Sequence, residues 1–549
     1  MTTPTAGDGT VRAATMQLLR ELGMTTVFSN PSLTEMKLFE NWPDDIRFVM
    51  GLQEATVVAM ADGYAQATGV SPLVIVNGGA GLGNAMGSVY NASGAHTPMV
   101  IIGGQQGRRM MLGEPFLKAR DATLLPQPYV KWTGEPARPQ DVPELLLKAF
   151  HIANQAPKGP VFVSIPEDDW VRPAAEVPVV PRRVRNAVSP DQEALTELAA
   201  ALNAAERPAL VAGPAVETQG ARQDLVALAE RLNATVYGSP AWPRASFPET
   251  HPRFGRHLPP IPAMISEILS GHDVVAVLGG PAFTLITSMD LFATHPADLD
   301  SKVVWDALPE GTTILHVTDD PEQASWSIAS TTYVCPPGAA VRGLVPLIEP
   351  RGEAAEPVAR EEIPVPEATE PLTQAYLFHT LAQELPPDAA VFEELPIDRT
   401  YFHEQIHLGP GNDYFASTTG ALGFPFAGAV GYAMARPDRR TVAVVGEGSA
   451  QYTLHALWTA AKHNLPVTFV IPDNAGYVSL KISIMEQEKW RSGWDLTGVD
   501  TAAIAQGFGC PAERVETASQ LQEALKRSFT VDGPVLLDVM IAGPEGIHL

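Results

Sequence analysis

The stretch VVGEGSAQYTLHALWTAAKHNLPVTFVIPDNAGY, residues 444–477, decides the fold class. It contains an apolar run that ends in Gly-Glu-Gly-Ser, a helix-like segment, and a second apolar run that ends in Asp-Asn-Ala-Gly. Short Val/Ile/Leu runs that alternate with helical segments are typical of parallel sheets covered on both faces. Both strands of a right-handed βαβ unit end at the same edge of the sheet. We therefore expect Glu447 and the Asp473–Asn474 pair to be neighbours in space.

The same alternation continues through the chain and predicts an α/β protein with three doubly wound parallel-sheet domains. Two stretches rich in proline and charge, roughly 171–190 and 349–371, are typical of linkers. The expected domains are therefore 1–180, 190–348 and 370–549. The predicted strands lie in the runs TTVFSN, PLVIVNGG, MVIIGG, PVFVSIP, PALVAGP, ATVYGSP, DVVAVLGG, TILHVT, TVAVVGEGS, PVTFVIPDN and PVLLDVM.

Composition excludes several classes of protein. The 549 residues carry a formal net charge of −25, which repels nucleic acid and anionic membrane surfaces. The two cysteines, Cys335 and Cys510, are too few and too far apart for a disulfide scaffold or a cysteine metal site. The N-terminus lacks a signal-peptide pattern, and the chain has no apolar run long enough to span a bilayer. We expect a cytoplasmic protein without nucleic-acid or membrane partners.

The end of the first run in the opening stretch indicates a ligand. A glutamate between two glycines is unusual, because turns prefer Gly, Asn, Asp and Pro. Glu447 and Asn474 offer hard oxygen ligands of the kind that suit Mg²⁺, while the backbone N–H groups of Gly446, Gly448 and Ser449 can face phosphates. The alternative is an ordinary βαβ turn with a solvated glutamate.

Two stretches near the N-terminus also contain candidate site residues. In LQEATVVAMADGYAQATG the apolar positions have helical spacing, and Glu54 lies at the predicted helix start. Its alternative role is to interact with the helix dipole. The stretch NGGAGLGNAMG, residues 77–87, follows a predicted strand as the glycine-rich turn of a dinucleotide site would. The next strand does not end in an acidic residue that could bind a ribose, so a tight turn is an equal alternative, and nothing supports an FAD site.

Together these motifs resemble the thiamine-diphosphate-dependent enzymes, and most closely the benzoylformate decarboxylases. The resemblance covers nearly the whole chain. It rests on the LQEA helix, the glycine-rich loop, and a Gly-Glu-Gly-Ser motif followed by Asn-Ala-Gly. Further similar stretches are LLRELGMTTVFSNP, GNAMG, GGQQ, YVKW, GPVFVSIPEDDW, SEILSGHDVV, ALWTAA and GPVLLDV.

The resemblance implies a role for each matching residue. Glu54 matches the catalytic glutamate that hydrogen-bonds the aminopyrimidine ring of the cofactor, and Leu422 matches the bulky residue that holds the cofactor in its bent shape. Glu447, Asn474 and the carbonyl of Gly476 match the ligands of Mg²⁺, or of Ca²⁺ or Mn²⁺ in its place. The residues that match the diphosphate- and cofactor-binding positions are Gly446, Gly448, Ser449, Asn474, Gly476 and Tyr477.

This sequence departs from the family pattern in two ways. The motif around Glu447 is GEG where the family usually has GDG, so the metal ligand is one methylene longer. The family's serine and two histidines, which bind the substrate carboxylate and move protons, are replaced by Leu33, Asn77 and Ile286. Asn77 can donate a hydrogen bond but cannot shuttle protons. We expect a substrate pocket formed by Ser32, Leu33, Asn77, Ile286, Leu480 and Ser483, and a structural turn at His96.

The resemblance implies a C–C bond enzyme that acts on a 2-oxo acid or an aldehyde. A 2-oxo acid decarboxylase is the first expectation, with Glu54 and Asn77 as its catalytic residues. The alternatives are a carboligase or hydroxyketone lyase of the same superfamily, and a protein that keeps the cofactor fold without turnover. The resemblance also implies a homo-oligomer, expected to be a dimer of dimers, with the cofactor between the first domain of one subunit and the third domain of another.

Overall fold

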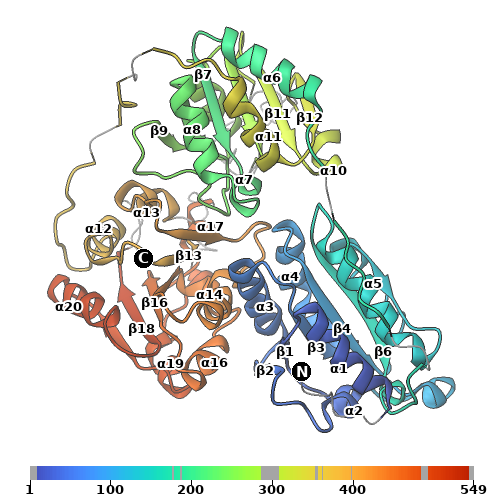
Figure 1. Ribbon diagram of the computed structural model, residues 1–549. Coiled ribbons are helices and arrows are strands. Elements are labelled where there is room, and N and C mark those ends of the chain that lie inside the picture. The colour runs from blue at the N-terminus through green and yellow to red at the C-terminus, as the bar shows by residue number, and fades with distance from the viewer. Residues whose placement is uncertain are drawn as a thin grey trace. The chain divides into compact units, whose positions relative to one another are not determined.

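The computed structural model describes residues 9–175, 179–185, 188–285, 308–352, 356–360, 363–396, 398–483 and 492–542. The chain forms two compact units. One unit comprises residues 1–185, 366–402 and 417–549, and the other comprises residues 186–365 and 403–416. Three six-stranded parallel sheets, each flanked by helices, make up the fold, which confirms the predicted class (Figure 1).

The first sheet has the strand order β2-β1-β3-β4-β6-β5. Its strands are β1 (Thr26–Ser29), β2 (Arg47–Met50), β3 (Leu73–Asn77), β4 (Met99–Gln105), β5 (Thr133–Gly134) and β6 (Pro160–Pro166). Its helices are α1 (Val11–Leu22), α2 (Met36–Phe39), α3 (Glu54–Thr68), α4 (Ala80–Gly94) and α5 (Val142–Asn154), with short 3-10 turns at Leu33–Glu35, Arg108–Gly113, Gln127–Tyr129, Pro139–Asp141 and Glu167–Asp169.

The central sheet has the order β12-β11-β10-β7-β8-β9. Its strands are β7 (Pro208–Ala212), β8 (Thr235–Gly238), β9 (Phe254–His257), β10 (Val274–Leu278), β11 (Thr313–Thr318) and β12 (Thr331–Val334). The helices are α6 (Gln192–Ala204), α7 (Pro214–Thr218), α8 (Arg222–Leu232), α9 (Pro262–Leu269), α10 (Pro321–Ser325) and α11 (Pro337–Leu344), followed by a 3-10 turn at Val345–Leu347.

The third sheet has the order β14-β13-β15-β16-β18-β17. Its strands are β13 (Ala390–Glu394), β14 (Asp413–Ala416), β15 (Thr441–Val445), β16 (Val467–Asp473), β17 (Ala512–Val515) and β18 (Val535–Met540). The helices are α12 (Gln374–Glu384), α13 (Arg399–Gln405), α14 (Phe424–Ala435), α15 (Glu447–Ala450), α16 (Ala456–Lys462), α17 (Val478–Ser483), α19 (Thr501–Gly507) and α20 (Ala518–Ser528), with a 3-10 turn at Ser492–Trp494.

Each predicted apolar run forms a strand. The runs are buried on both faces, as parallel strands between helix layers require; β3, β6, β7 and β15 are buried at every position. The opening stretch differs from expectation in one detail. Its helical part is not one helix, because α15 ends after four residues and a turn precedes α16.

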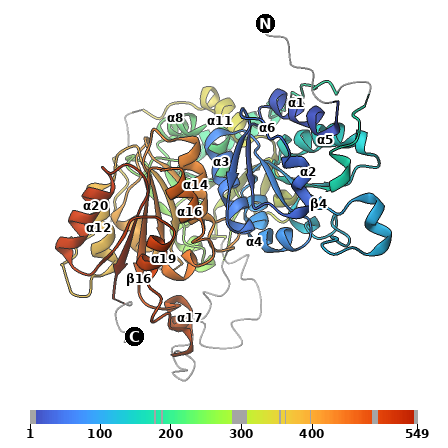
Figure 2. The same ribbon diagram turned by 90° about the horizontal axis from the view of Figure 1, so that it is seen from below.

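Helices α3 and α14 pack closely within the first unit (Figures 1 and 2). Glycines make this approach possible. A methyl group on Gly63 would lie 2.0 Å from the carbonyl oxygen of Gly428, and one on Gly431 would lie 1.8 Å from that of Met60. The contact joins the helix that begins at Glu54 to the helix that begins at Phe424.

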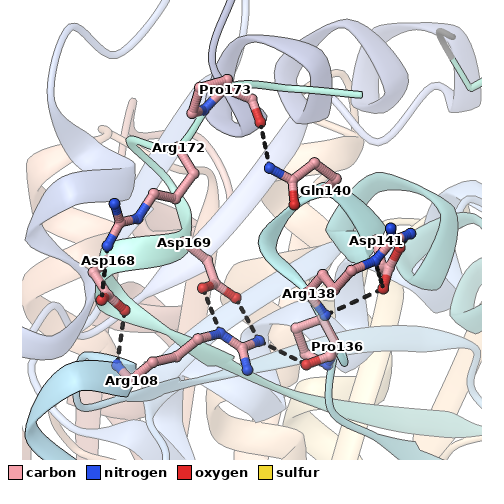
Figure 3. Close-up of polar contacts among 9 residues, drawn as sticks. All are labelled: Arg108, Pro136, Arg138, Gln140, Asp141, Asp168, Asp169, Arg172 and Pro173. Atoms are coloured by element: carbon pink, nitrogen blue, oxygen red, sulfur yellow. Dashed lines mark hydrogen bonds and ion pairs between the residues drawn. The ribbon is translucent and has the colours of Figure 1, made fainter. Parts of the chain in front are cut away.

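A buried ion pair holds the segment after β4 against the end of β6 (Figure 3). The Arg108 guanidinium donates to both carboxylate oxygens of Asp169, at 2.7 and 2.9 Å, and to the Pro136 carbonyl oxygen at 2.6 Å. The Arg108 backbone N–H donates to Asp168 at 2.8 Å. Because Asp169 is fully buried, this two-point pairing fixes the loop that follows the strand end.

Among the described residues, no helix is long and apolar enough to cross a membrane.

Candidate active site

Three groups meet where β15 and β16 end. The Gly476 backbone N–H donates to Glu447 Oε1 at 2.8 Å. The Asn474 side-chain amide points at the same Glu447 oxygen and at the Gly476 carbonyl oxygen, with separations of 2.9 and 2.8 Å. If the amide presents its nitrogen, it donates to both; if it presents its oxygen, three oxygens converge on one point. The expected proximity of Glu447 to the end of β16 is confirmed by these contacts.

With the Asn474 amide oxygen turned inward, the cluster fits a divalent cation. Ligand oxygens on neighbouring corners of a Mg²⁺ octahedron, with bonds of about 2.0–2.1 Å, lie about 2.9 Å apart, close to the separations in this cluster. Burial raises the pKa of Glu447 to about 8, and the charges of Asp473 and Asp398 add to the rise. A cation at this point would reverse that effect and favour the carboxylate.

The backbone between Asn474 and Gly476 is strained. Ala475, between Asn474 and Gly476, has a φ of 58°, which L-residues other than asparagine and aspartate rarely adopt. The Asp473 side chain caps this turn by accepting the Ala475 N–H at 2.8 Å. Such strain, of order 1–3 kcal/mol, tends to occur at functional sites. Here it directs the Asn474 amide and the Gly476 carbonyl toward Glu447.

Residues of α15 and the residues just before α14 pack around this cluster. A methyl group on Gly448 would lie 2.9 Å from the Tyr477 ring, so only glycine fits there. Gly446 donates its N–H to the Glu394 carbonyl oxygen at 3.1 Å, and Ser449 is buried in α15. Leu422 is half-buried and lies two residues before the start of α14.

Glu394, at the end of β13, was absent from the residues expected to bind the cofactor. Its Oε2 accepts the Gly423 N–H at 2.7 Å, while its Oε1 has no hydrogen-bond partner among the described residues. Burial raises the pKa of Glu394 to about 8. The signal in the sequence is a pair of glutamates that closes a buried apolar run, AVFEE.

A second group of residues lies at the ends of β1 and β3 and the start of α3. Glu54 is the first residue of α3, as expected, and its Oε2 accepts the Asn84 side-chain amide at 3.1 Å. A methyl group on Gly81 would lie 3.1 Å from both Glu54 Oε1 and Asn77 Cβ. Gly81 therefore lets the start of α4 approach the Glu54 carboxylate closely, where a larger residue would crowd both Glu54 and Asn77.

Asn77 ends β3 and is part of a hydrogen-bonded chain. Its Nδ2 donates to Thr34 Oγ1 at 3.0 Å and approaches Ser32 Oγ at 3.5 Å, while its Oδ1 accepts the Gly79 N–H at 3.1 Å. Thr34 in turn donates to the carboxylate of Glu35. Asn77 thus both caps the turn before α4 and connects to a buried acid.

Glu35 is a further residue that the sequence did not reveal as part of the site. Its Oε2 accepts the Ser32 N–H at 2.7 Å, and burial raises the pKa of its carboxyl group. A methyl group on Gly104 would lie 1.9 Å from Glu35 Oε1, so the glycine in β4 makes room for the carboxylate. The only sequence signal is the spacing Ser32-x-x-Glu35, which forms a capping box.

The remaining expected residues are placed as follows. Leu33 is 70% exposed and Leu480 is 48% exposed on this chain, so neither lines a buried pocket in one subunit. Ile286 and the side chain of Ser483 lie outside the described residues. His96 has a φ of 52°, and its Nδ1 lies 3.3 Å from the Lys158 carbonyl oxygen, which agrees with the expected structural turn.

Comparisons with known proteins identify the family. Three models of thiamine pyrophosphate enzymes match in order: the N-terminal TPP binding domain at residues 9–123, the central domain at 195–344 and the C-terminal TPP binding domain at 399–539. The chain is 37% identical to a benzoylformate decarboxylase of Pseudomonas aeruginosa over 542 residues, which cover 96% of this chain and 98% of the relative.

Solved structures agree with this result. A thiamine diphosphate-dependent 4-hydroxybenzoylformate decarboxylase of Rhodococcus jostii RHA1 has a TM-score of 0.92 and 35% identity, with coverage of 98% of this chain and 100% of that one. A benzoylformate decarboxylase of Polynucleobacter necessarius has a TM-score of 0.90 and 32% identity, with coverage of 97% and 99%. Because sequence and structure match along almost the whole length, the chain belongs to the thiamine pyrophosphate enzyme family, in the branch close to the benzoylformate decarboxylases.

Proposed function

We propose that this chain is a thiamine-diphosphate-dependent 2-oxo acid decarboxylase that uses a divalent cation. The observation that supports the proposal most directly is the convergence of Glu447, Asn474 and the Gly476 carbonyl at the carboxyl ends of two neighbouring strands. In this proposal they bind Mg²⁺, or Ca²⁺ or Mn²⁺. The ion neutralises the cofactor diphosphate, which lies beside the backbone of Gly446, Gly448 and Ser449.

The other cofactor contacts follow from the same placement. Glu54 hydrogen-bonds the aminopyrimidine ring, and the side-chain amide of Asn84 holds its carboxylate in place. Leu422 supports the bent cofactor, and the Tyr477 ring closes the site over Gly448. When bound, thiamine diphosphate supplies the carbon nucleophile and the electron sink needed to break the bond to the carboxylate. The chain's own residues position it and control protons.

Proton delivery is where this chain is expected to differ from its relatives. Asn77 carries no titratable proton, but its amide connects through Thr34 to the buried carboxyl of Glu35. We propose that Asn77 orients the substrate and that Glu35 is the acid at the end of this hydrogen-bonded chain. The raised pKa of Glu35 keeps a larger share of it protonated near neutral pH.

The substrate is an apolar 2-oxo acid in this proposal. Ser32 and Leu33 directly precede Thr34, the hydrogen-bond partner of Asn77. Leu480 lies in α17, shortly after the proposed metal ligands Asn474 and Gly476. Ile286 and Ser483 stay candidates for the same pocket on the basis of the sequence alone. The exposure of Leu33 and Leu480 on a single chain is consistent with a pocket that a second subunit completes.

A second candidate is a carboligase, or in reverse a hydroxyketone lyase. The hydrogen bonds of Asn77 favour it, because a group that only donates and accepts fixed hydrogen bonds transfers protons slowly. The fragment left after loss of CO₂ would then bond to a second aldehyde before it is protonated. A cofactor-binding protein without turnover is the third candidate, and the presence of Glu54 argues against it.

The test is a panel of 2-oxo acids, including benzoylformate, with CO₂ release and product analysis in the presence and absence of excess acetaldehyde. A decarboxylase releases CO₂ and free aldehyde in equal amounts. A carboligase releases CO₂ but accumulates hydroxyketone when acetaldehyde is present. Asn77→His should move the product ratio toward free aldehyde. Absence of CO₂ release from every acid, with a folded and cofactor-loaded protein, would exclude the decarboxylase.

A further inference from the structure

A cluster of metal-ligating side chains lies in the second unit, apart from the residues discussed above. It consists of Glu249, His257 at the end of β9, and His403. Glu249 Oε1 lies 2.8 Å from His257 Nε2 and 3.3 Å from His403 Nδ1, and the three ligand atoms all lie within 4.8 Å of one another. The side chains are 1%, 10% and 7% exposed, so the cluster is shielded from bulk water.

Two imidazole nitrogens and one carboxylate oxygen form a donor set suited to divalent transition metals. Zn²⁺ binds such ligands at about 2.0–2.2 Å, so the donor atoms around a tetrahedral ion lie about 3.3 Å apart. The two separations from Glu249 Oε1 fall close to this value. The donors therefore need to move by no more than about 1 Å to surround an ion. Mg²⁺, which prefers oxygen ligands, is less suited to this set.

Outer contacts orient each ligand. Glu249 Oε2 accepts the Leu408 backbone N–H at 3.1 Å, which directs Oε1 toward the imidazoles. His403 Nε2 lies 3.3 Å from the Tyr414 hydroxyl, and a proton donated there leaves a lone pair on Nδ1. The Trp242 ring stacks on His257 with centroids 3.6 Å apart and planes 10° apart. Metal-binding histidines usually have such a second hydrogen bond and a packed ring.

The cluster joins two pieces of chain that are distant in sequence. His403 and Leu408 belong to segment 403–416. Glu249 lies just before the edge strand β9, and His257 is the last residue of that strand. The segment is also held by the Glu249 backbone N–H, which donates to the Leu408 carbonyl oxygen at 2.9 Å, and by Arg222, which donates to the carbonyls of Pro410 and Asn412 at 3.3 and 3.2 Å. A bound ion would add a link that depends on the metal.

We propose that Glu249, His257 and His403 bind a divalent transition metal ion, for which Zn²⁺ is the probe, and that this ion fastens segment 403–416 to the central sheet. The site is distinct from the Mg²⁺ site proposed at Glu447. Its role is structural, and water completes the coordination.

The experiment uses full-length protein stripped with chelator and then saturated with Mg²⁺ and thiamine diphosphate. Zn²⁺ is titrated by calorimetry, and Co²⁺ is added separately to observe the visible absorption of a tetrahedral site. We expect one Zn²⁺ per chain with a Kd below about 1 μM, and a rise in the melting temperature of at least about 2–4 °C. Glu249→Gln and His403→Gln should each weaken Zn²⁺ binding at least tenfold and abolish that rise.

Two controls separate this site from others. His251→Gln alters a nearby histidine that contacts Glu230 instead, and it should bind Zn²⁺ as the unaltered protein does. Glu447→Ala removes the proposed cofactor cation and should also leave Zn²⁺ binding unchanged, so failure here is distinguishable from failure of the proposed function. The proposed metal site would be excluded if the unaltered protein and His403→Gln bound Zn²⁺ equally, or if the Kd for Zn²⁺ exceeded about 100 μM. The three side chains would then form a hydrogen-bonded cluster without a metal. If a variant does not fold, the Co²⁺ spectrum of the unaltered protein decides.

Discussion

Three buried carboxyl groups lie at the carboxyl edge of the third sheet. Burial raises the pKa of Glu394 and of Glu447 to about 8 and that of Asp398 to about 7. Carboxyl groups in this state cost free energy when they ionise without a partner. A cation and the polar groups of a bound cofactor would supply the missing partner, so the site's stability and its ligand binding are linked.

Glu447→Ala should weaken the binding of thiamine diphosphate, because the diphosphate loses the cation that neutralises it. We expect a loss of at least tenfold in affinity, measured by calorimetry in Mg²⁺. Removal of Mg²⁺ from the unaltered protein should have the same effect. Glu447→Asp is the matched control and should bind the cofactor, since it restores the residue usual in the family. Equal cofactor affinity with and without a divalent cation would contradict the assignment.

Glu54→Gln should lower turnover by roughly 10²–10⁴-fold, the range for loss of an acid–base group, while circular dichroism stays unchanged. The amide keeps the shape and the hydrogen bond to Asn84 but cannot stabilise the proton shift on the aminopyrimidine. Substituting the exposed Glu516 by Gln serves as a control and should leave turnover unchanged. Turnover of Glu54→Gln within twofold of the unaltered enzyme would exclude this role.

Glu394→Gln should change how the cofactor-free protein's stability depends on pH. The folded-state pKa of Glu394 is raised from 4.5 to about 8, so the folded protein retains a proton that the unfolded chain has lost. The associated stability is complete below pH 4.5 and disappears as pH rises toward 8. One pKa unit corresponds to about 1.4 kcal/mol. We therefore expect the variant to gain about 1–3 kcal/mol over the parent between pH 5.5 and 8 in urea unfolding; a constant difference across this range would contradict the shift.

The sequence predicted the site residues that belong to recognisable motifs and missed those that do not. Glu447 and the Asp473–Asn474 pair follow apolar runs, so the parallel-sheet rule predicted that they would meet, while Gly476 was expected only from the family resemblance. Glu35 ends a short 3-10 turn that begins with the exposed Leu33, and only the fold shows that Gly104 leaves space for it. Glu249 and His403 are far apart in sequence, and no local pattern connects them.

At the scale of elements, the predicted strands were those buried on both faces. The edge strands β2, β5, β9, β12, β14 and β17 were not predicted. They are short, and several are partly exposed, as the residues of β12 and β17 illustrate. The interior strand β13 was also missed, because its run ends in two glutamates that a hydrophobicity pattern does not recognise as buried.

The contact between α3 and α14 makes a prediction at this scale. Gly63→Ala should destabilise the protein by at least about 2 kcal/mol, because its methyl group would overlap the Gly428 carbonyl and force the helices apart. Gly83→Ala in α4 is the matched control: nothing lies within 4 Å of the added methyl group, so it should be neutral or stabilising by about 1 kcal/mol. Unfolding in urea measures both. Equal stability of the two variants would contradict the close packing.

For the whole molecule, the two proposed halves of the cofactor site lie at the ends of different sheets. We propose that Glu54 of one subunit serves a cofactor whose diphosphate is held by Glu447 of another, in a dimer that pairs into a tetramer. Equal mixtures of Glu54→Gln and Glu447→Ala proteins, at a cofactor concentration where neither is active alone, should recover about a quarter of the sites, because about half of the randomly formed dimers are hybrids and each hybrid has one intact site. Subunit exchange followed by an activity assay measures this. A fully active monomer in light scattering would exclude the arrangement.

The glycine contact between α3 and α14 has a consequence for such a dimer. Within one chain, α3 begins at Glu54 and α14 begins two residues after Leu422, so the two helices would reach toward different cofactors. Backbone packed directly on backbone has no side chains to absorb movement. In such a dimer, a displacement of α3 beside one cofactor would therefore be transmitted directly to α14 beside the other.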